Sequence, residues 1–429
     1  MAKILIYSPN EIGKSMAGAA IRSWEFAKIL AAKHQTVLFA QNVSKVDPEQ
    51  FEILAFHDPR LKQHFRDADI LITQRLTLSL AVLTIKHRLK IIIDAYVPRP
   101  LELLEHMKEA PSKEVFNSEI SNLLLSFKMA DGILCATERQ RALWIGFLLG
   151  QKLLSPTLYA RDPSLRDFLA LVPFGLSSIA PRKTGKGLKE KFRLKESDHV
   201  IIWGGGIWDW FDPLTLIHAM HLIQQKRSDI KLVFMGITPP DPTLPKTSLS
   251  AKVIQLAERL SLVNQSVFFN YDWIPYEERQ NFLVEATLGA STHFDHLETT
   301  FSFRTRILDY LWANLPILTT EGDGFADLIK QNNLGIVVPY QNAEAIAHGL
   351  LAIFDEPNKL LTMQKNVSQL KEQFYWSKVS EPLQKMVDRL CTAPYARSRW
   401  KEGKALSAFL IQKIKTRLFI KGARIFQVL

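Results

Sequence analysis

Short apolar runs alternate with longer amphipathic stretches along most of the chain. In the first part the apolar runs are KILIYS, TVLFA, ADILIT, KIIIDAY and ADGILCA, and charged or helical segments such as residues 20–33 separate them. Strands that alternate with helices are typical of βαβ units and of a parallel sheet. We expect the run LVPFGL at residues 171–176 to end the last strand of this part.

A second series of strand-like runs follows a segment at residues 177–190 that is rich in Ser, Pro, Gly and Lys and is typical of a linker. The runs are HVIIWGGG, IKLVFMG, SVFFNYD, LGASTHF, PILTTEG and LGIVVP, again with helical patterns between them. The sequence therefore predicts an α/β fold of two doubly wound halves that face one cleft. Ligands of such sheets bind at the carboxyl ends of the strands.

The composition is that of a globular protein, because 47% of the 429 residues are hydrophobic and 23% are charged. Cys135 and Cys391 have no metal-ligand spacing and indicate reduced thiols in a reducing compartment. The first apolar run breaks at Ser8-Pro9-Asn10, which is not typical of a signal peptide. No run reaches the roughly 18 apolar residues that a bilayer span needs. We expect a cytoplasmic protein.

The net charge of +11 lies mostly in the tail, since residues 397–429 contain nine Lys or Arg and one Glu. The nearly neutral remainder argues against nucleic-acid binding. Apolar residues recur at helical spacing in the tail, with cations between them, which is typical of a helix on an anionic membrane surface. A helix docked on the first half is the alternative. The apolar positions are Leu406, Phe409, Leu410, Ile414 and Leu418, and the cations are Lys404, Lys413, Lys415, Arg417, Lys421 and Arg424.

Glycines follow the first strand of each half. Gly13 and Gly18 lie in SPNEIGKSMAGAAIR, where a plain strand-to-helix turn explains them. Gly204, Gly205 and Gly206 come directly after a strand, and bare backbone N–H groups there could line a phosphate pocket. Two tryptophans follow this loop and indicate either a surface for a sugar or base or packing within the domain. They are Trp208 and Trp210.

The segment FFNYDWIPYEER ends a strand and continues as a loop. Asn270 and Tyr271 could hydrogen-bond or stack on a base, and a purely structural loop explains them equally well. Later in the chain, His293, Asp295 and His296 have a spacing too loose to indicate a metal site.

The stretch HLETTFSFRTRILDYLW, residues 296–312, places four charges in an apolar run. We expect Ser302 to cap the amino end of a helix there, which puts Arg304 and Arg306 in its first turn. Cations are unfavourable at that end of a helix, so their position indicates a bound anion. Asp309 lies further along this stretch than Glu298, where it could accept hydrogen bonds from a ribose diol.

Residues 306–316, RILDYLWANLP, resemble the K-x-x-E-Y-M-A-x-G-x-P pattern of family-4 glycosyltransferases. The segments MAGAAIRSWEFAKIL, ADGILCATERQR, WGGGIWDWFDPLTLIHAM and YDWIPYEER look like a bacterial branch of those enzymes in cell-surface polysaccharide pathways. This resemblance implies a GT-B fold: a Rossmann-like acceptor domain at residues 1–180, a Rossmann-like donor domain at 190–370, a crossing helix region at 371–395 and the tail at 396–429.

The resemblance also implies a chemistry. The enzyme would transfer a sugar from a nucleotide-diphosphate donor to a glycan or lipid-linked acceptor. The resemblance also implies that the enzyme retains the anomeric configuration and needs no metal or other cofactor. The tail would hold it on the inner face of the membrane. The alternatives are a sugar-nucleotide epimerase on the same fold and a nonenzymatic nucleic-acid-binding protein. Incubation with the donor and no acceptor distinguishes the epimerase from the glycosyltransferase.

The resemblance assigns roles to particular residues. Asp309 would bind the ribose hydroxyls, and Glu298 would lie near the hydroxyls of the donor sugar. Asp94 stands where many members have a histidine close to that sugar. The backbone of Thr300, Phe301 and Ser302, the Arg306 guanidinium and the family's first glycine loop at Gly18 would complete the donor site.

Three departures from the family pattern affect this assignment. Asp309 replaces a glutamate and is shorter. Glu298 lies eleven residues before Asp309, where the family has a spacing of eight. The family's Arg and Lys after the first strand of the second half are absent from GGGIWDWFDP, so Arg304 or Arg306 would replace them.

Overall fold

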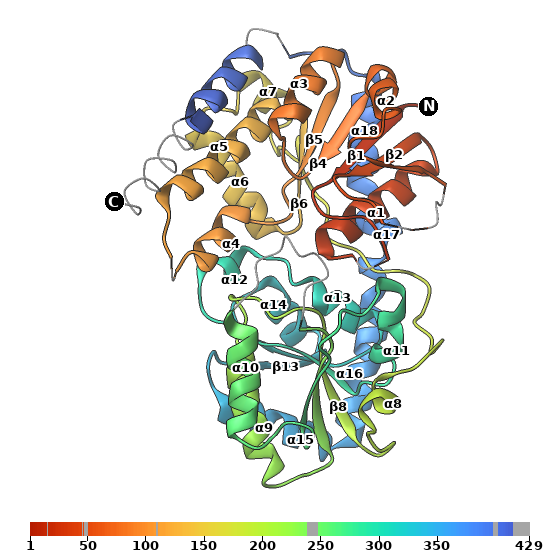
Figure 1. The fold of residues 1–429 in the computed structure, drawn as a ribbon, viewed down its shortest axis with the longest axis vertical. Helices are drawn as coiled ribbons and strands as arrows, with labels where there is room; N and C mark the ends of the chain where they lie inside the picture. The colour runs from red at the N-terminus through yellow and green to blue at the C-terminus, as the bar shows by residue number, and fades with distance from the viewer. Residues whose placement is uncertain are drawn as a thin grey trace. The chain divides into compact units, whose positions relative to one another are not determined.

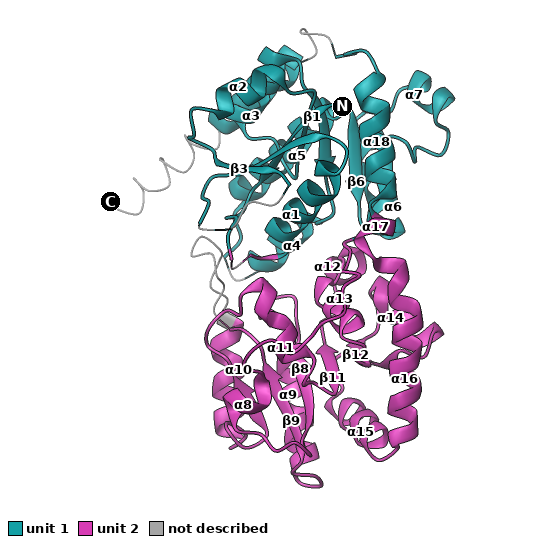
Figure 2. Cartoon of the chain, turned by 90° about the vertical axis from the view of Figure 1, so that its right-hand side faces the viewer, with its two compact units in different colours: residues 1–13, 18–173, 380–429 teal, residues 14–17, 174–379 magenta. Residues whose placement is uncertain are grey.

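The computed structural model describes the chain except residues 15, 45, 47–49, 109, 238–247, 398–401 and 415–429. It forms two compact units (Figure 2). Unit 1 consists of residues 1–13, 18–173 and 380–429, and unit 2 of residues 14–17 and 174–379. The chain therefore passes into unit 2 just before the segment predicted as a linker. It returns at residues 379 and 380, inside the range where the sequence placed the crossing helix.

Unit 1 is built on a seven-stranded sheet in the order β3-β2-β1-β4-β5-β6-β7, and every strand pair is parallel. The strand β3 was not predicted, because it is an edge strand with only one buried residue of four. The run LVPFGL begins only at the end of β7. The strands are β1 Lys3–Ser8, β2 Gln35–Ala40, β3 Glu52–Ala55, β4 Ile70–Thr73, β5 Lys90–Asp94, β6 Gly132–Cys135 and β7 Leu169–Leu171.

Helices connect these strands (Figure 1). The side chains of Thr77, Ser112 and Thr137 accept a backbone N–H in the first turn of α3, α5 and α6, which fixes where these helices begin. The helices are α1 Gly18–Ala31, α2 Leu61–Asp67, α3 Leu78–His87, α4 Arg99–His106, α5 Lys113–Met129, α6 Glu138–Gly150, α7 Pro156–Arg161 and α18 Glu381–Thr392.

Unit 2 has a six-stranded parallel sheet in the order β10-β9-β8-β11-β12-β13. All six strands lie in the runs that the sequence singled out, which confirms the doubly wound architecture. The strand order reverses between β8 and β11, so the topological switch point of this sheet lies there. The strands are β8 His199–Trp203, β9 Ile230–Phe234, β10 Val267–Phe269, β11 Leu288–Ser291, β12 Ile317–Thr320 and β13 Gly335–Val338.

Helices cover both faces of a parallel sheet, which is why strands such as β11 and β12 are buried at every residue. Most α-helices of unit 2 are short. They are α8 Leu188–Phe192, α9 Pro213–Gln224, α10 Ser248–Arg259, α11 Arg279–Leu283, α12 Leu297–Phe301, α13 Thr305–Trp312, α14 Gly324–Gln331, α15 Ala343–Phe354, α16 Pro357–Leu370 and α17 Trp376–Val379, with 3-10 turns at Tyr276–Glu278 and Lys371–Phe374.

The basic tail contains a separate helix over residues 402–414, beside α5 (Figure 1). Ala405 and Phe409 are buried in the core of unit 1, whereas Leu410, Ile411 and Ile414 are exposed. One face of this helix is therefore docked on unit 1, as the alternative prediction had it. The tail positions Lys415, Arg417, Leu418, Lys421 and Arg424 lie outside the described residues. Across the part of the chain that the structure describes, no helix has the length and apolarity of a bilayer span.

Arg397 connects the tail to unit 1. Its guanidinium donates to the backbone carbonyls of Leu89 and Met129, and it pairs with the carboxylates of Asp131 at 2.7 Å and Glu402 at 3.1 Å. Burial raises the pKa of Asp131, and Arg397 opposes that rise. The stability of the Asp131 carboxylate therefore depends on the tail.

We predict that truncation after Pro394 lowers the free energy of unfolding by at least about 3–5 kcal/mol. The truncation leaves Asp131 without its cation and removes Phe409 from the core, and either loss alone has this magnitude. Urea unfolding followed by circular dichroism measures the difference. Truncation after Ile414 keeps both contacts and is the control, so equal midpoints for the two truncated chains contradict the prediction.

Candidate functional site

The carboxyl ends of β8 and β11 meet at the switch point of the unit 2 sheet, and α13 packs against both. Tyr310 holds these parts together, because its hydroxyl accepts the Gly204 N–H at 2.8 Å and donates to the Ala290 carbonyl at 2.7 Å. A Cβ at Gly289 would lie 2.3 Å from the Tyr310 ring, so this approach requires glycine. Gly205 has a φ of +80°, a conformation that also favours glycine.

Arg306, at the start of α13, is buried against the glycine loop. Its Nη2 donates to the Gly206 carbonyl at 2.7 Å, and its guanidinium lies 3.9 Å from the ring centroid of Phe211 and 4.4 Å from that of Trp203. Burial lowers the pKa of Arg306 to about 10, so it remains a cation at neutral pH. Among the described residues its Nη1 has no hydrogen-bond partner and no carboxylate pairs with it. A buried cation with an unused donor is suited to an anionic ligand.

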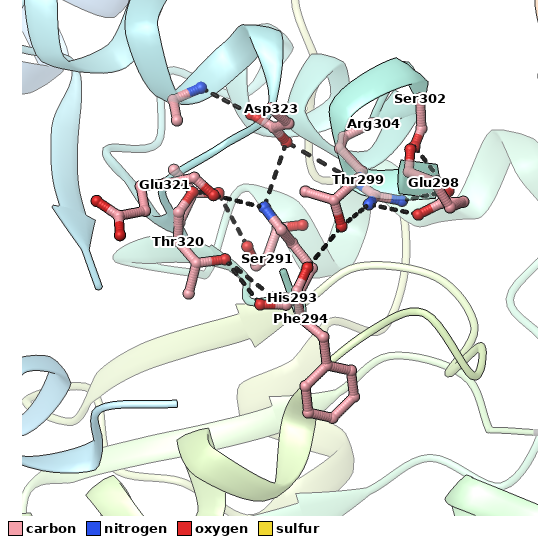
Figure 3. Close-up of polar contacts among 12 residues, drawn as sticks. Ser291, His293, Phe294, Glu298, Thr299, Ser302, Arg304, Thr320, Glu321 and Asp323 are labelled. Atoms are coloured by element: carbon pink, nitrogen blue, oxygen red, sulfur yellow. Dashed lines mark hydrogen bonds and ion pairs between the residues drawn. The ribbon is translucent and has the colours of Figure 1, made fainter. Parts of the chain in front are cut away.

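Glu298 and Arg304 form a bidentate pair inside unit 2 (Figure 3). Both nitrogen–oxygen distances are 2.8 Å, and the residues are 1% and 4% exposed. The Ser302 hydroxyl lies 2.6 Å from Glu298 Oε1 and 2.7 Å from the Glu298 carbonyl oxygen. The carboxylate predicted to contact the sugar is therefore occupied by Arg304 in this structure.

The predicted helix in this stretch is two helices. Glu298 belongs to α12, and Ser302 ends α12 as its C-cap. Arg304 precedes α13 as its N-cap residue, without a side-chain capping bond. The prediction that Ser302 caps the amino end of the helix is therefore wrong, because its hydroxyl turns back to Glu298.

The backbone predicted to face the diphosphate is partly engaged within α12. The Thr300 N–H donates to the His296 carbonyl at 3.3 Å, and the Ser302 N–H donates to the Glu298 carbonyl at 2.8 Å. Phe301 lies between them and is partly buried. These two amides have protein acceptors, whereas the Arg306 Nη1 has none in the described part of the chain.

His293 joins the loops after β11 and β12 (Figure 3). Its backbone N–H donates to Thr320 Oγ1 at 3.0 Å, and its Nε2 lies 3.2 Å from the Glu321 carbonyl oxygen. Burial, with Arg304 nearby, lowers the pKa of His293 well below its usual value, so the imidazole is neutral and Nε2 carries the proton. The described residues contain no cluster of three His, Cys, Asp or Glu side chains arranged to hold a metal ion.

Asn270 shapes the loop after β10. Its Nδ2 donates to the backbone carbonyls of Met235 and Asp272, each at 2.8 Å. The next residue, Tyr271, is 56% exposed. Trp208 stacks on Trp210 with a centroid distance of 5.9 Å and packs on the core of unit 2. The structural interpretation therefore applies to Asn270 and Trp208, while Tyr271 presents its ring to solvent.

Asp309 pairs with a residue that the sequence analysis did not single out. Its Oδ1 accepts from Arg279 Nε at 3.1 Å, whereas Arg306, three residues earlier, donates to the Gly206 carbonyl. Arg279 stands in the quoted segment FFNYDWIPYEER. The two residues are thirty positions apart, so no local spacing signalled the pair.

Two further candidates belong to unit 1. Gly18 is the first residue of α1. Asp94 ends β5, and both of its oxygens accept from Arg22, at 2.7 and 2.9 Å. Arg22 also donates to the carbonyls of Val172 and Pro173. The structure therefore gives Asp94 the role of a buried ion-pair partner in place of a free catalytic carboxylate.

Comparisons with known proteins agree with this architecture. Residues 188–370, most of unit 2, match the family model described as "Glycosyl transferases group 1". No curated protein sequence matches the chain.

Solved structures resemble the chain over both units, with 91–92% of it covered in the three examples that follow. Sucrose-phosphate synthase (tll1590) from Thermosynechococcus elongatus has a TM-score of 0.64 at 13% identity, over 92% of this chain and 100% of that one. Anabaena Alr3699/HepE in complex with UDP and glucose has 0.64 at 13%, over 91% and 100%. WaaG, a glycosyltransferase involved in lipopolysaccharide biosynthesis, has 0.60 at 14%, over 91% and 100%. The chain has the GT-B fold. The segment that matches the family model contains the glycine loop, Glu298, Arg306 and Asp309.

We predict that Glu298→Ala lowers the free energy of unfolding by about 3–5 kcal/mol, because the buried Arg304 loses its bidentate partner and keeps only the Asp323 carboxylate, 3.8 Å from its Nε. Chemical denaturation measures the loss. Glu190→Ala is the control, since it breaks an exposed pair with Lys186 and is expected to change stability by less than about 0.5 kcal/mol.

The same pair allows a test of the sugar contact. If Glu298→Gln keeps the stability of the wild-type chain and its affinity for nucleoside diphosphate but loses turnover, Glu298 acts on the sugar. If stability falls with turnover, the ion pair explains both losses.

Proposed function

We propose that the protein is a glycosyltransferase that moves a sugar from a nucleotide-diphosphate donor to a glycan or lipid-linked acceptor. The observation that carries the proposal is Arg306, a buried cation beside the glycine loop whose Nη1 has no hydrogen-bond partner among the described residues. It lies at the topological switch point, where open α/β sheets bind their ligands. The family match of unit 2 and the likeness to Anabaena HepE, solved with UDP-glucose, support the same donor class.

In this mechanism Arg306 binds the diphosphate and stabilises the negative charge that develops on it as the sugar departs. Such preorganised electrostatic stabilisation is usually the largest contribution to catalysis of this kind. The rings of Phe211 and Trp203 fix the guanidinium and exclude water, which strengthens its interaction with an anion. Asp309 accepts hydrogen bonds from the ribose. As the resemblance to family-4 enzymes implies, transfer would retain the anomeric configuration and need no metal.

We further propose that the enzyme acts in the synthesis of a cell-surface polysaccharide, in the cytoplasm and at the inner face of the membrane. The exposed residues Leu410, Ile411 and Ile414 form the outer stripe of the tail helix. Lys404 and Lys413 lie on the same helix. Exposed apolar side chains together with the exposed cation Lys404 favour an anionic bilayer, where a lipid-linked acceptor is found, whereas Lys413 donates to Ser118 of α5.

The donor site is tested with nucleoside diphosphates and their sugars in a thermal-shift screen. A ligand at 100 times its dissociation constant stabilises the folded chain by about 2.7 kcal/mol. For the ligand that binds, we predict that Arg306→Ala and Asp309→Asn each lower affinity at least about tenfold, since each removes a hydrogen bond that involves a charge.

Calorimetric titration measures these affinities. Arg227→Ala is the control, because Arg227 pairs with Asp229 near the amino ends of the strands, away from the glycine loop. Unchanged nucleotide affinity in folded Arg306→Ala would sink the proposed donor site.

The membrane surface is tested on the full-length chain with vesicles that contain anionic phospholipid. We predict that the pair Ile411→Glu and Ile414→Glu reduces sedimentation with these vesicles, because it places two carboxylates on the apolar stripe. Ala408→Glu is the control, since Ala408 is also exposed on this helix but is not part of the stripe. Equal sedimentation of the wild-type chain and the double variant at low salt means that the stripe does not bind membranes.

A further inference from the structure

Arg279 is fixed in place by several independent contacts. Its Nη1 donates to the Tyr276 carbonyl. The guanidinium lies 3.7 Å from the ring centroid of Tyr276 and 4.6 Å from that of Trp312. Its side chain is only 11% exposed, and its Nε points to Asp309. Trp312 and Asp309 are both on α13, so Arg279 contacts one helix through a ring and a carboxylate.

Asp309 is held by one oxygen only. Oδ1 accepts from Arg279 at 3.1 Å, whereas Oδ2 has no hydrogen-bond partner among the described residues, and the side chain is 30% exposed. A carboxylate has about four acceptor positions, so one bond to Arg279 leaves room for two hydroxyl donors. The carboxylate is thus oriented and still open to a ligand.

We propose that Arg279 is a positioning residue that makes Asp309 selective for a nucleotide with a complete ribose diol. This inference rests on the proposed function and assigns a specificity element to the same site. Asp309 is shorter than a glutamate and needs a fixed rotamer to reach two hydroxyls. The hydrogen bond from Arg279 Nε fixes the rotamer of Asp309. The rings of Tyr276 and Trp312 in turn hold the Arg279 guanidinium in place and keep it from turning out into solvent.

The charge of Arg279 has a second effect. A lone carboxylate in the donor site repels the diphosphate of the ligand, and the repulsion is stronger where protein excludes water. Pairing with Arg279 gives an ion pair with no net charge, while the acceptor oxygens of Asp309 stay in place. The 2′-hydroxyl of a ribonucleotide then donates a hydrogen bond to the charged Asp309 carboxylate. A 2′-deoxy nucleotide cannot form this hydrogen bond.

The test compares each ribonucleoside diphosphate with its 2′-deoxy counterpart by calorimetric titration, for uridine, guanosine and adenosine. The wild-type chain is expected to bind its preferred ribonucleotide at least about tenfold more tightly than the deoxy form, the range for a hydrogen bond to a charged group. In Arg279→Met this ratio falls below about threefold, mainly through weaker ribonucleotide binding. In an Asp309→Ala background, Arg279→Met leaves the remaining ratio unchanged.

Arg227→Met is the matched control, because it removes another ion-paired arginine of unit 2 and should leave the ratio unchanged. Arg279→Lys, which keeps the charge but not the planar contacts, should give an intermediate ratio and replaces the methionine variant if that chain does not fold. A purely structural role for Arg279 weakens both nucleotides equally, and that result overturns the assignment. If no nucleoside diphosphate binds the wild-type chain, the proposed function itself fails.

Discussion

The buried pair of Glu298 and Arg304 is the constraint on which the donor side of unit 2 depends. Removing two charges from water is expensive, and the attraction compensates only when the geometry is good and the remaining acceptors are satisfied. Here the pair is bidentate, and Ser302 and Thr299 occupy further positions around it. The pair ties α12 to the residue that precedes α13. It therefore fixes where α13 begins and directs Arg306, two residues later, to the glycine loop.

The four charges of residues 296–312 have different environments. Glu298 and Arg304 neutralise each other, Asp309 pairs with Arg279, and Arg306 has two rings and a carbonyl. Only Arg306 combines burial with the lack of an anionic partner in the described structure. Evolution of a stable core alone gives no reason to keep such a group, because a hydrophobic side chain of similar volume would avoid its desolvation penalty. An anionic ligand gives that reason.

Much of the fold could be predicted from the sequence, because a parallel sheet covered on both faces leaves continuous apolar runs. The edge strand β3 lacked such a run and was missed. Within the candidate site, the glycine loop and Arg306 could be singled out from local order alone, and their role in donor binding stays a prediction. The partners were not, since Arg279 with Asp309 and Arg22 with Asp94 are joined only by the fold. Ser302 was misassigned because a serine before a helix has the same local pattern whether it caps that helix or ends the previous one.

The tail shows why one amphipathic pattern supported two interpretations. Phe409 and Leu410 are adjacent in sequence and were assigned to one apolar stripe, yet Phe409 is 4% exposed and Leu410 is 37% exposed. Neighbouring residues on a helix are separated by about 100°, so two adjacent apolar residues point to different surfaces. The face with Ala405 and Phe409 packs on unit 1, whereas Ile411 and Ile414 are exposed and have no packing partner among the described residues. A helix that needed only to dock would be polar on that second face. Docking and the proposed membrane binding therefore concern opposite sides of the same helix, and docking of one side leaves the other exposed to solvent.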